Sequence, residues 1–217
     1  MTNVPARSGN PIPAYLVPTP AGVGFALGAP DPDPARLVLN ALLRGGSSRP
    51  MPLAMLAEVS GIGDRKSLGA ILFALQRDGK LSGDVEPLAV AREPLGDAVP
   101  PLLEAMSTDG RGVLADDHGL CYAFAGYSCD EAQRVAACAP SAWQLLRRHR
   151  EHVIGAANRE TYTLALLDET AGARLIIRPL FVGEQVFHLC LSGLAHPNSP
   201  ALTKLGALLL RRYVGPC

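Results

Sequence analysis

Lysine and aromatic residues are scarce in this chain. Only three of the 217 residues are lysine (Lys66, Lys80 and Lys204), and aromatic residues make up 5% of the sequence. Because 48% of the residues are apolar, Ala, Leu and Val have to build most of the core. Arginine supplies the remaining basic charge, which we attribute to codon preference and not to phosphate recognition.

The chain also lacks net charge, since 20 basic side chains balance 20 acidic ones. Up to residue 94 there are nine basic and eight acidic side chains, a net charge of +1, so the remainder carries −1. This balance argues against a polybasic membrane anchor and against a nucleic-acid coat protein. It also leaves no strongly basic half that would indicate a DNA-reading module.

Long apolar runs are absent. No segment approaches the roughly 18 residues that a membrane-spanning helix needs, and the first residues lack the apolar stretch of a secretory signal. We therefore expect a cytoplasmic protein without membrane contact.

Close cysteine pairs are absent as well. The five cysteines show no CxxC spacing, which argues against a zinc site and a disulfide framework. We interpret them as free, inert core thiols in a reducing compartment. They are Cys121, Cys129, Cys138, Cys190 and Cys217.

Proline is plentiful at the start of the chain, where eight prolines lie among the first 34 residues. This density excludes a helix and predicts an extended, Pro-rich arm over residues 1–31. Within the arm, residues 14–17 and 23–27 could pair as a hairpin around the turn at 18–22.

A compact helical module is predicted over residues 32–93. Apolar periodicity indicates helices at 35–43, 52–59 and 64–76, the last capped by Asp64. A strand at 80–82 and a turn at 83–84 follow. This order resembles a winged helix.

Residues 94–217 alternate between helical and strand patterns. A helix beginning near Asp97, with Pro100 and Pro101 in its first turn, precedes strands at 112–115 and 120–126. A long helix with a Ser128–Glu131 capping box follows, and Pro140 is expected to interrupt and kink it. Three strands and a closing helix capped by Ser199 complete an α+β order. These strands are expected at 161–167, 173–181 and 185–191, and the helix runs to about residue 213.

The segment Val113–Ala123 carries a resemblance to a known family. Its acidic turn and the Gly119-Leu120 pair, which lead into a small-residue strand, are similar to the opening hairpin of the roadblock (longin-related) family. The resemblance covers residues 95–217 and implies an α-β-β-α-β-β-β-α, profilin-like domain with a five-stranded antiparallel sheet. Members of the family are usually non-catalytic dimers that bind small Ras-like GTPases or serve as adaptors. In their dimers two sheets commonly join edge to edge while the long helices pack together.

The resemblance points to the outer face of the long helix as a homodimer or partner interface. Small residues on this second face suit close approach of another surface. The alternative is that the helical module covers this face within the same chain. The residues concerned are Arg134, Ala137, Cys138, Ser141 and Leu145.

No catalytic, cofactor or metal site is predicted. The glycines of residues 22–28 and 60–67 do not fit a dinucleotide loop or a P-loop. His149 and His152 have helical spacing but lie among arginines, which repel a metal cation. No Ser, Cys and His arrangement indicates a catalytic triad.

The sequence therefore favours a non-enzymatic regulatory adaptor that dimerises and binds a small GTPase or another protein. The alternative is a dimeric winged-helix transcription regulator, with Arg65 and Lys66 at the start of its recognition helix. Nearby Asp64 and Asp78 disfavour contact with a phosphate backbone, so we rank nucleic acid lower as a partner. A small-ligand sensor is a third, weaker class, since profilin-like sheets can carry pockets.

Overall fold

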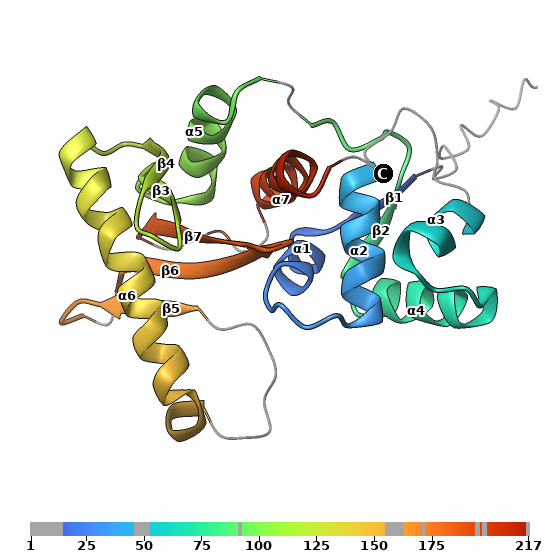
Figure 1. Ribbon diagram of the computed structural model, residues 1–217. Coiled ribbons are helices and arrows are strands. Elements are labelled where there is room, and N and C mark those ends of the chain that lie inside the picture. Colours follow the sequence, from blue (N-terminus) through green and yellow to red (C-terminus); the bar gives the residue numbers. More distant parts are fainter. Residues whose placement is uncertain are drawn as a thin grey trace, which may run out of the picture.

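The computed structural model describes residues 15–45, 53–90, 93–154, 163–170, 172–193, 196 and 199–215. Within them, a five-stranded antiparallel sheet is covered by helices on both faces, and a helical module extends from one of these layers (Figure 1). The sheet order is β4-β3-β7-β6-β5, so β4 and β5 are its edges. Its strands are β3 (Gly112–Asp116), β4 (Cys121–Ala125), β5 (Leu164–Leu167), β6 (Ala173–Val182) and β7 (Gln185–Ser192).

The second half of the chain has the order of elements expected from the sequence. Helix α5 (Leu95–Met106) precedes β3 and β4, α6 (Cys129–Ile154) follows them, and α7 (Pro200–Tyr213) follows β7. The predicted α-β-β-α-β-β-β-α order and the five-stranded antiparallel sheet are therefore confirmed. The start predicted for the third strand, at residues 161 and 162, lies outside the described residues.

Helix α6 covers one face of the sheet. Its capping box forms as predicted, because the backbone N–H of Ser128 donates to the Glu131 carboxylate at 2.9 Å. Ala132, Ala136 and Ala139 are fully buried in a cluster that includes Val113, Ala115, Ile177 and Cys190 of the strands. The expected interruption at Pro140 is wrong, since the helix continues through this residue. Packing of both halves against the sheet outweighs the single backbone hydrogen bond that proline removes.

Helices α5 and α7 cover the opposite face. Helix α7 begins as expected, with the Ser199 side chain accepting from the N–H of Ala201 and Pro200 in its first turn. Helix α5 begins earlier than expected, so Pro100 and Pro101 lie inside the helix and not in its first turn. The Pro94 carbonyl accepts from the N–H groups of Asp97 and Ala98, which starts the helix ahead of the paired prolines.

The segment after residue 14 is not an extended arm, and the predicted hairpin is wrong. Strand β1 (Tyr15–Pro18) pairs with β2 (Leu81–Asp84), and residues 20–26 form helix α1 (Pro20–Ala26). Thr19 caps this helix and Pro20 lies in its first turn, where its missing N–H costs nothing. Burial of Val23 and Leu27 then stabilises a helix that proline density alone disfavours.

The three helices of the predicted module are confirmed as α2 (Pro34–Gly45), α3 (Leu53–Ser60) and α4 (Arg65–Arg77). Asp64 caps α4 as expected, accepting from the N–H groups of Lys66 and Ser67. Strand β2 follows but pairs with the upstream strand β1. A second wing strand is not found in residues 85–90 or 93. The resemblance to a winged helix therefore stays a prediction.

The helical module and the sheet share one hydrophobic core. Buried residues of α1, α2, α3 and α4 belong to the same cluster as those of α5, α7 and the adjoining sheet face. Helix α7 packs against both α1 and α2, and α1 also reaches the sheet, where the N–H of Phe181 donates to the Leu27 carbonyl. The module therefore packs on the sheet face opposite α6, and it does not cover the outer face of α6 (Figure 1).

Candidate functional site

The outer face of α6 is the candidate interaction surface. All five residues selected from the sequence are exposed there, and they recur at three- and four-residue intervals along one stripe. Leu145 is 62% exposed, which is unusual for a leucine on a helix that packs on a sheet. The structure thus brings the predicted residues together on one uncovered helix face. They are Arg134, Ala137, Cys138, Ser141 and Leu145.

Close packing against the turn between β3 and β4 fixes the position of α6. Gly119 has a φ of +81°, and a Cβ atom there would lie 3.0 Å from the Cα atom of Ala137. The side-chain amide of Gln133 donates to the Gly119 carbonyl at 3.1 Å. Only glycine satisfies both the backbone conformation and the short approach. The acidic turn singled out in the sequence therefore supports the helix that carries the stripe.

A buried histidine anchors the same turn. The His188 side chain is 0% exposed, and its Nε2 atom lies 3.2 Å from Oδ1 of Asp117. Burial lowers the pKa of His188, and the Asp117 carboxylate offsets part of this effect. The neutral ring donates its Nε2–H to Asp117, while Nδ1 is buried without a hydrogen-bond partner.

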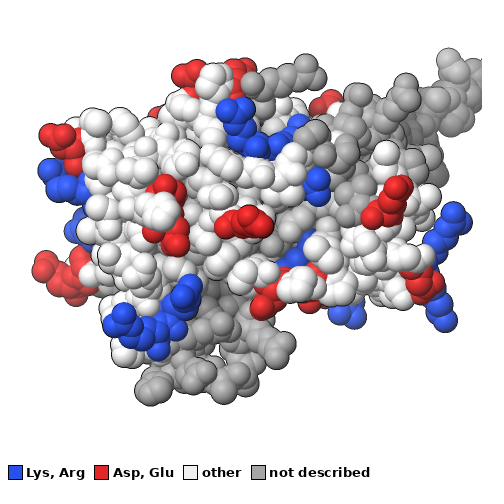
Figure 2. All heavy atoms as spheres, viewed as in Figure 1, with Lys and Arg blue, Asp and Glu red and all other residues white. Residues whose placement is uncertain are grey.

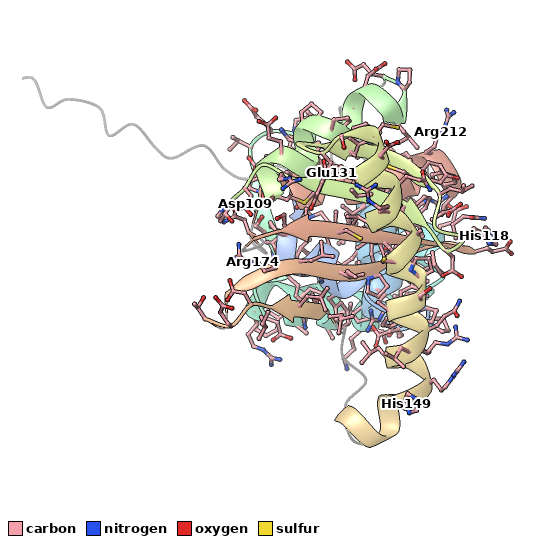
Figure 3. All side chains as sticks on the ribbon, turned by 90° about the vertical axis from the view of Figure 1, so that its left-hand side faces the viewer. Asp109, His118, Glu131, His149, Arg174 and Arg212 are labelled. Atoms are coloured by element: carbon pink, nitrogen blue, oxygen red, sulfur yellow. The ribbon has the colours of Figure 1, made fainter. Side chains whose placement is uncertain are left out.

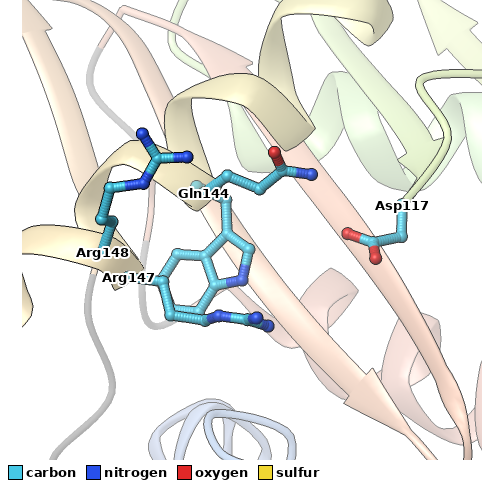
Figure 4. Close-up of a pocket in the computed structure, with 5 residues that line it drawn as sticks. Asp117, Gln144, Arg147 and Arg148 are labelled. Carbon is cyan, nitrogen blue, oxygen red and sulfur yellow. The ribbon is translucent and has the colours of Figure 1, made fainter.

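A hollow of about 410 Å³ opens between this turn and the second half of α6 (Figure 4). Asp117 lies on one side of it, and Gln144, Arg147 and Arg148 lie on the helix side. Trp143 also lines it and packs edge-on against Phe181, with 6.2 Å between ring centroids. The hollow offers polar groups of both charge signs to a partner side chain. Elsewhere, charged side chains of both signs are scattered over the face drawn in Figure 2.

The sheet edge at β5 is a second exposed apolar feature, and the sequence did not indicate it. Leu166 and Leu167 are 51% and 60% exposed, and the strand carries no charged side chain. The opposite edge, β4, packs against α5. The sequence of β5 is four consecutive apolar residues, Leu164–Leu167. Such a run predicts a strand but does not distinguish an edge strand from a buried one.

Helix α6 runs across the strands and connects the two features. Figure 3 shows Glu131 near the start of the helix, beside β3 and β4, and His149 near its other end, past β5. The helix contacts β5 and β6 as well as β3, β4 and β7. The outer stripe and the β5 edge together are the candidate surface, here called the α6–β5 surface.

The cysteines differ from the core thiols that the sequence predicted. Cys190 is buried, and burial raises its pKa to about 12. Cys129 and Cys138 are both exposed on α6. The core-thiol prediction is therefore wrong for Cys129, whereas Cys138 was expected on the outer face of the helix. Residues at the helix surface escape burial because only one side of α6 faces the sheet. Cys121 is partly buried, and Cys217 lies outside the described residues.

The candidate nucleic-acid residues Arg65 and Lys66 are both exposed in the first turn of α4. The Asp64 carboxylate accepts from the N–H of Ser67 at 2.9 Å and from its hydroxyl at 2.6 Å. These bonds lower the pKa of Asp64, so a fixed negative charge occupies this helix end. Such a charge opposes a phosphate group at the same place. The two residues belong to the helical module, away from α6 (Figure 1).

The described residues provide neither a metal cluster nor a membrane span. Within the ranges given above, no three His, Cys, Asp or Glu side chains lie together as metal ligands. His149 is exposed, and His152 is outside the described side chains. No helix among the described residues is both long and apolar enough to cross a bilayer.

No protein-family profile matches this chain, and no curated protein matches it. Among solved structures, a Roadblock/LC7 domain from Streptomyces avermitilis is similar, with a TM-score of 0.38 and 16% identity. The match covers 55% of this chain and 94% of that domain. MglB from Myxococcus xanthus has a TM-score of 0.32 and 16% identity, with coverage of 54% and 85% respectively. Both matches span little more than half of this chain.

Proposed function

We propose that this chain is a non-enzymatic regulatory adaptor that forms a homodimer through the α6–β5 surface and binds a small Ras-like GTPase or another protein partner. One observation carries the proposal. Helix α6 carries an exposed stripe that includes Ala137 and Ser141, and it contacts the edge strand β5, which is uncharged and has two exposed leucines. Large exposed apolar side chains next to unpaired strand edges are typical of association surfaces.

A two-fold dimer would use both parts of this surface at once. Antiparallel pairing of β5 with its copy extends the sheet and satisfies the backbone groups at its edge. The same operation brings the second halves of two α6 helices towards each other, because each helix crosses the sheet and reaches β5. Ala137 and Ser141 are small enough for two helix backbones to approach closely, while Leu145 supplies apolar area.

The choice of a small GTPase as partner rests on the resemblance of Val113–Ala123 to the roadblock family. In the structure this segment contributes β3, β4 and the turn that supports α6. The adjoining hollow presents Asp117, Arg147 and Arg148 as groups that could pair with charged side chains. Partner selectivity would then come from charge complementarity around an apolar contact.

The mass of the full chain in solution tests the dimer. We expect a dimer by light scattering at micromolar concentration. The double variant Ala137→Glu and Ser141→Glu should give a folded monomer, because two facing helices cannot bury four carboxylates. Ala54→Glu with Ala70→Glu is the matched control, since both alanines are exposed on α3 and α4. A wild-type protein that stays monomeric at about 100 μM, the range of weak assemblies, would contradict the proposal.

The GTPase step needs a separate measurement. Calorimetry with a purified Ras-like GTPase from the same genome, loaded with GDP or with a non-hydrolysable GTP analogue, should show saturable binding. Arg147→Ala with Arg148→Ala should weaken binding by about tenfold or more if the hollow takes part. If the protein is a dimer but binds no such GTPase, the proposed dimer stands and the proposed GTPase partner is contradicted.

DNA binding finds less support in the structure. Arg65 and Lys66 are accessible. However, the Asp64 carboxylate caps the start of α4 immediately before them, so a negative charge lies next to both residues. Duplex DNA binding with a steep salt dependence, lost in Arg65→Ala with Lys66→Ala, would favour the transcription regulator instead.

A further inference from the structure

Among the residues that the structure describes, the partly buried cation Arg178 has no ionic partner. It lies on β6, on the sheet face that carries α1 and α7, and it is partly buried. Its Nε atom is buried without a hydrogen-bond partner, and it takes part in none of the ion pairs among the described residues. Burial lowers the pKa of its guanidinium, and no nearby anion opposes this effect. Arginine is rarely left in such surroundings unless an anion accompanies it.

The same arginine lines a cavity of about 180 Å³ on this sheet face. Ile176, Leu189 and Leu191 supply apolar walls from β6 and β7, and Thr163 and His196 are its exposed members. A cavity of about 150 Å³ with apolar walls holds a benzene-sized molecule. The combination is therefore a small apolar chamber with one cation in its lining.

We propose that this cavity binds a small monocarboxylate whose carboxylate pairs with Arg178 and whose apolar body, of roughly six to eight carbon atoms, fills the chamber. Guanidinium and carboxylate groups form two parallel hydrogen bonds, which suits a single arginine. Burial of the apolar body against the leucines and Ile176 adds hydrophobic stabilisation.

The charge of the cavity argues for a carboxylate over a phosphate ester. A phosphate monoester carries nearly two negative charges at neutral pH and offers three acceptor oxygens. Arg178 is the one permanently charged residue in the described lining, and only Thr163 and His196 add polar side chains. A single negative charge matches this lining without leaving an unpaired charge on the ligand.

Binding of benzoate to the full chain tests the proposal, with benzyl alcohol as an uncharged ligand of similar shape. We expect saturable benzoate binding, with affinity at least about tenfold higher than for benzyl alcohol. Methyl NMR signals of Ile176, Leu189 and Leu191 should shift, whereas Val113 on the other sheet face should not. Equal affinity for the two ligands, shifts confined to other residues, or no benzoate binding below about 10 mM would each overturn the proposal.

Two variants distinguish a direct contact between Arg178 and benzoate from a general effect of the protein's charge on benzoate binding. Arg178→Met removes the buried cation, which is expected to leave folding intact, and should abolish the preference for benzoate. Arg174→Met is the control, because Arg174 lies on the same strand but is exposed and pairs with Asp168 at 2.8 Å. Benzoate preference that survives in Arg178→Met would overturn the proposal. If that variant does not fold, the comparison of benzoate with benzyl alcohol on the unaltered protein still tests the proposal. The cavity lies on the sheet face opposite α6, and of its lining only Thr163 adjoins β5, so failure to dimerise does not decide the benzoate test.

Discussion

The backbone of Gly24 in α1 lies directly against the guanidinium of Arg178 in β6. A Cβ atom added at Gly24 would lie 3.2 Å from Cζ of that arginine and closer still to one of its nitrogen atoms. This contact joins the N-terminal helix to the sheet at the cavity wall. It exists because residue 24 has no side chain, although glycine is a poor helix former.

Gly24→Ala is expected to lose most of the stability gain that this substitution usually brings, because the new methyl group must push aside the end of the Arg178 side chain. In most helix interiors the same substitution stabilises by about 1 kcal/mol. Gly69→Ala in α4 is the matched control, since a Cβ atom there meets nothing within 4 Å. Urea unfolding of both variants checks the prediction. A stabilised Gly24→Ala variant would show that Arg178 moves aside freely.

The stability of the protein should fall as the pH drops below the ordinary His pKa of 6.5. Burial lowers the pKa of His188 in the folded state, so the unfolded state binds more protons in this range. The stabilisation that neutral His188 provides is therefore fully present above pH 6.5. It is lost as the pH falls from 6.5 towards the pKa of His188 in the folded state. Asp117→Asn should steepen the loss, because it removes the carboxylate that raises this pKa. The free energy of unfolding, measured between about pH 7.5 and pH 5, checks the sign.

His118→Gln is the control for this pH dependence, since His118 is exposed in the same turn. It should leave the slope unchanged, whereas His188→Leu should flatten it. A slope that persists in His188→Leu would assign the pH dependence to other groups.

Charged residues on the β5 edge should dissociate the proposed dimer without reducing stability. Leu166→Lys with Leu167→Lys places two cations where the strand would meet its copy, and lysine on an edge strand opposes pairing. We expect the dissociation constant to rise about tenfold or more by analytical ultracentrifugation. Leu120→Lys is the control, because Leu120 is 59% exposed but lies beside the opposite edge. Equal effects of both changes would place the interface elsewhere.

The reactivity of Cys138 should report the interface without any substitution there. Cys138 and Cys129 are both exposed on α6, and only Cys138 lies on the predicted stripe. Maleimide labelling of Cys138 should slow as protein concentration rises, while labelling of Cys129 stays constant. Cys190 should not react in the folded state, because it is buried and burial raises its pKa. Mass spectrometry of peptides resolves the three sites, and concentration-independent labelling of Cys138 would count against the interface.

The starts of three helices were predictable because their capping signals are local. Asp64, Ser128 and Ser199 each cap a helix within three residues of its start, and all three act as expected. The pairing of Tyr15 with Asp84 was not predictable, because nearly 70 residues separate the partners. No short pattern specifies such a contact, so residues 15–26 were interpreted from proline content and from two local apolar runs.

The candidate surface was predictable in part. Helical periodicity separates buried Ala136 from exposed Ala137 without knowledge of the sheet. The roles of Arg178 and β5 depend on strand order instead. From sequence alone, an arginine such as Arg178 in an apolar strand is expected to face solvent or to lie at a sheet edge. Its burial follows only from the packing of α1 on that face.

Helix α7 is surrounded, since every residue from Ala201 to Leu210 except Lys204 is buried. Its neighbours α1 and α2 are synthesised long before it, and they share its core. During translation these helices therefore leave the ribosome with an apolar face that has no partner until α7 has emerged. The chain is therefore expected to fold as one cooperative unit after α7 has been synthesised. Until then, chaperones are expected to bind the exposed apolar face of α1 and α2.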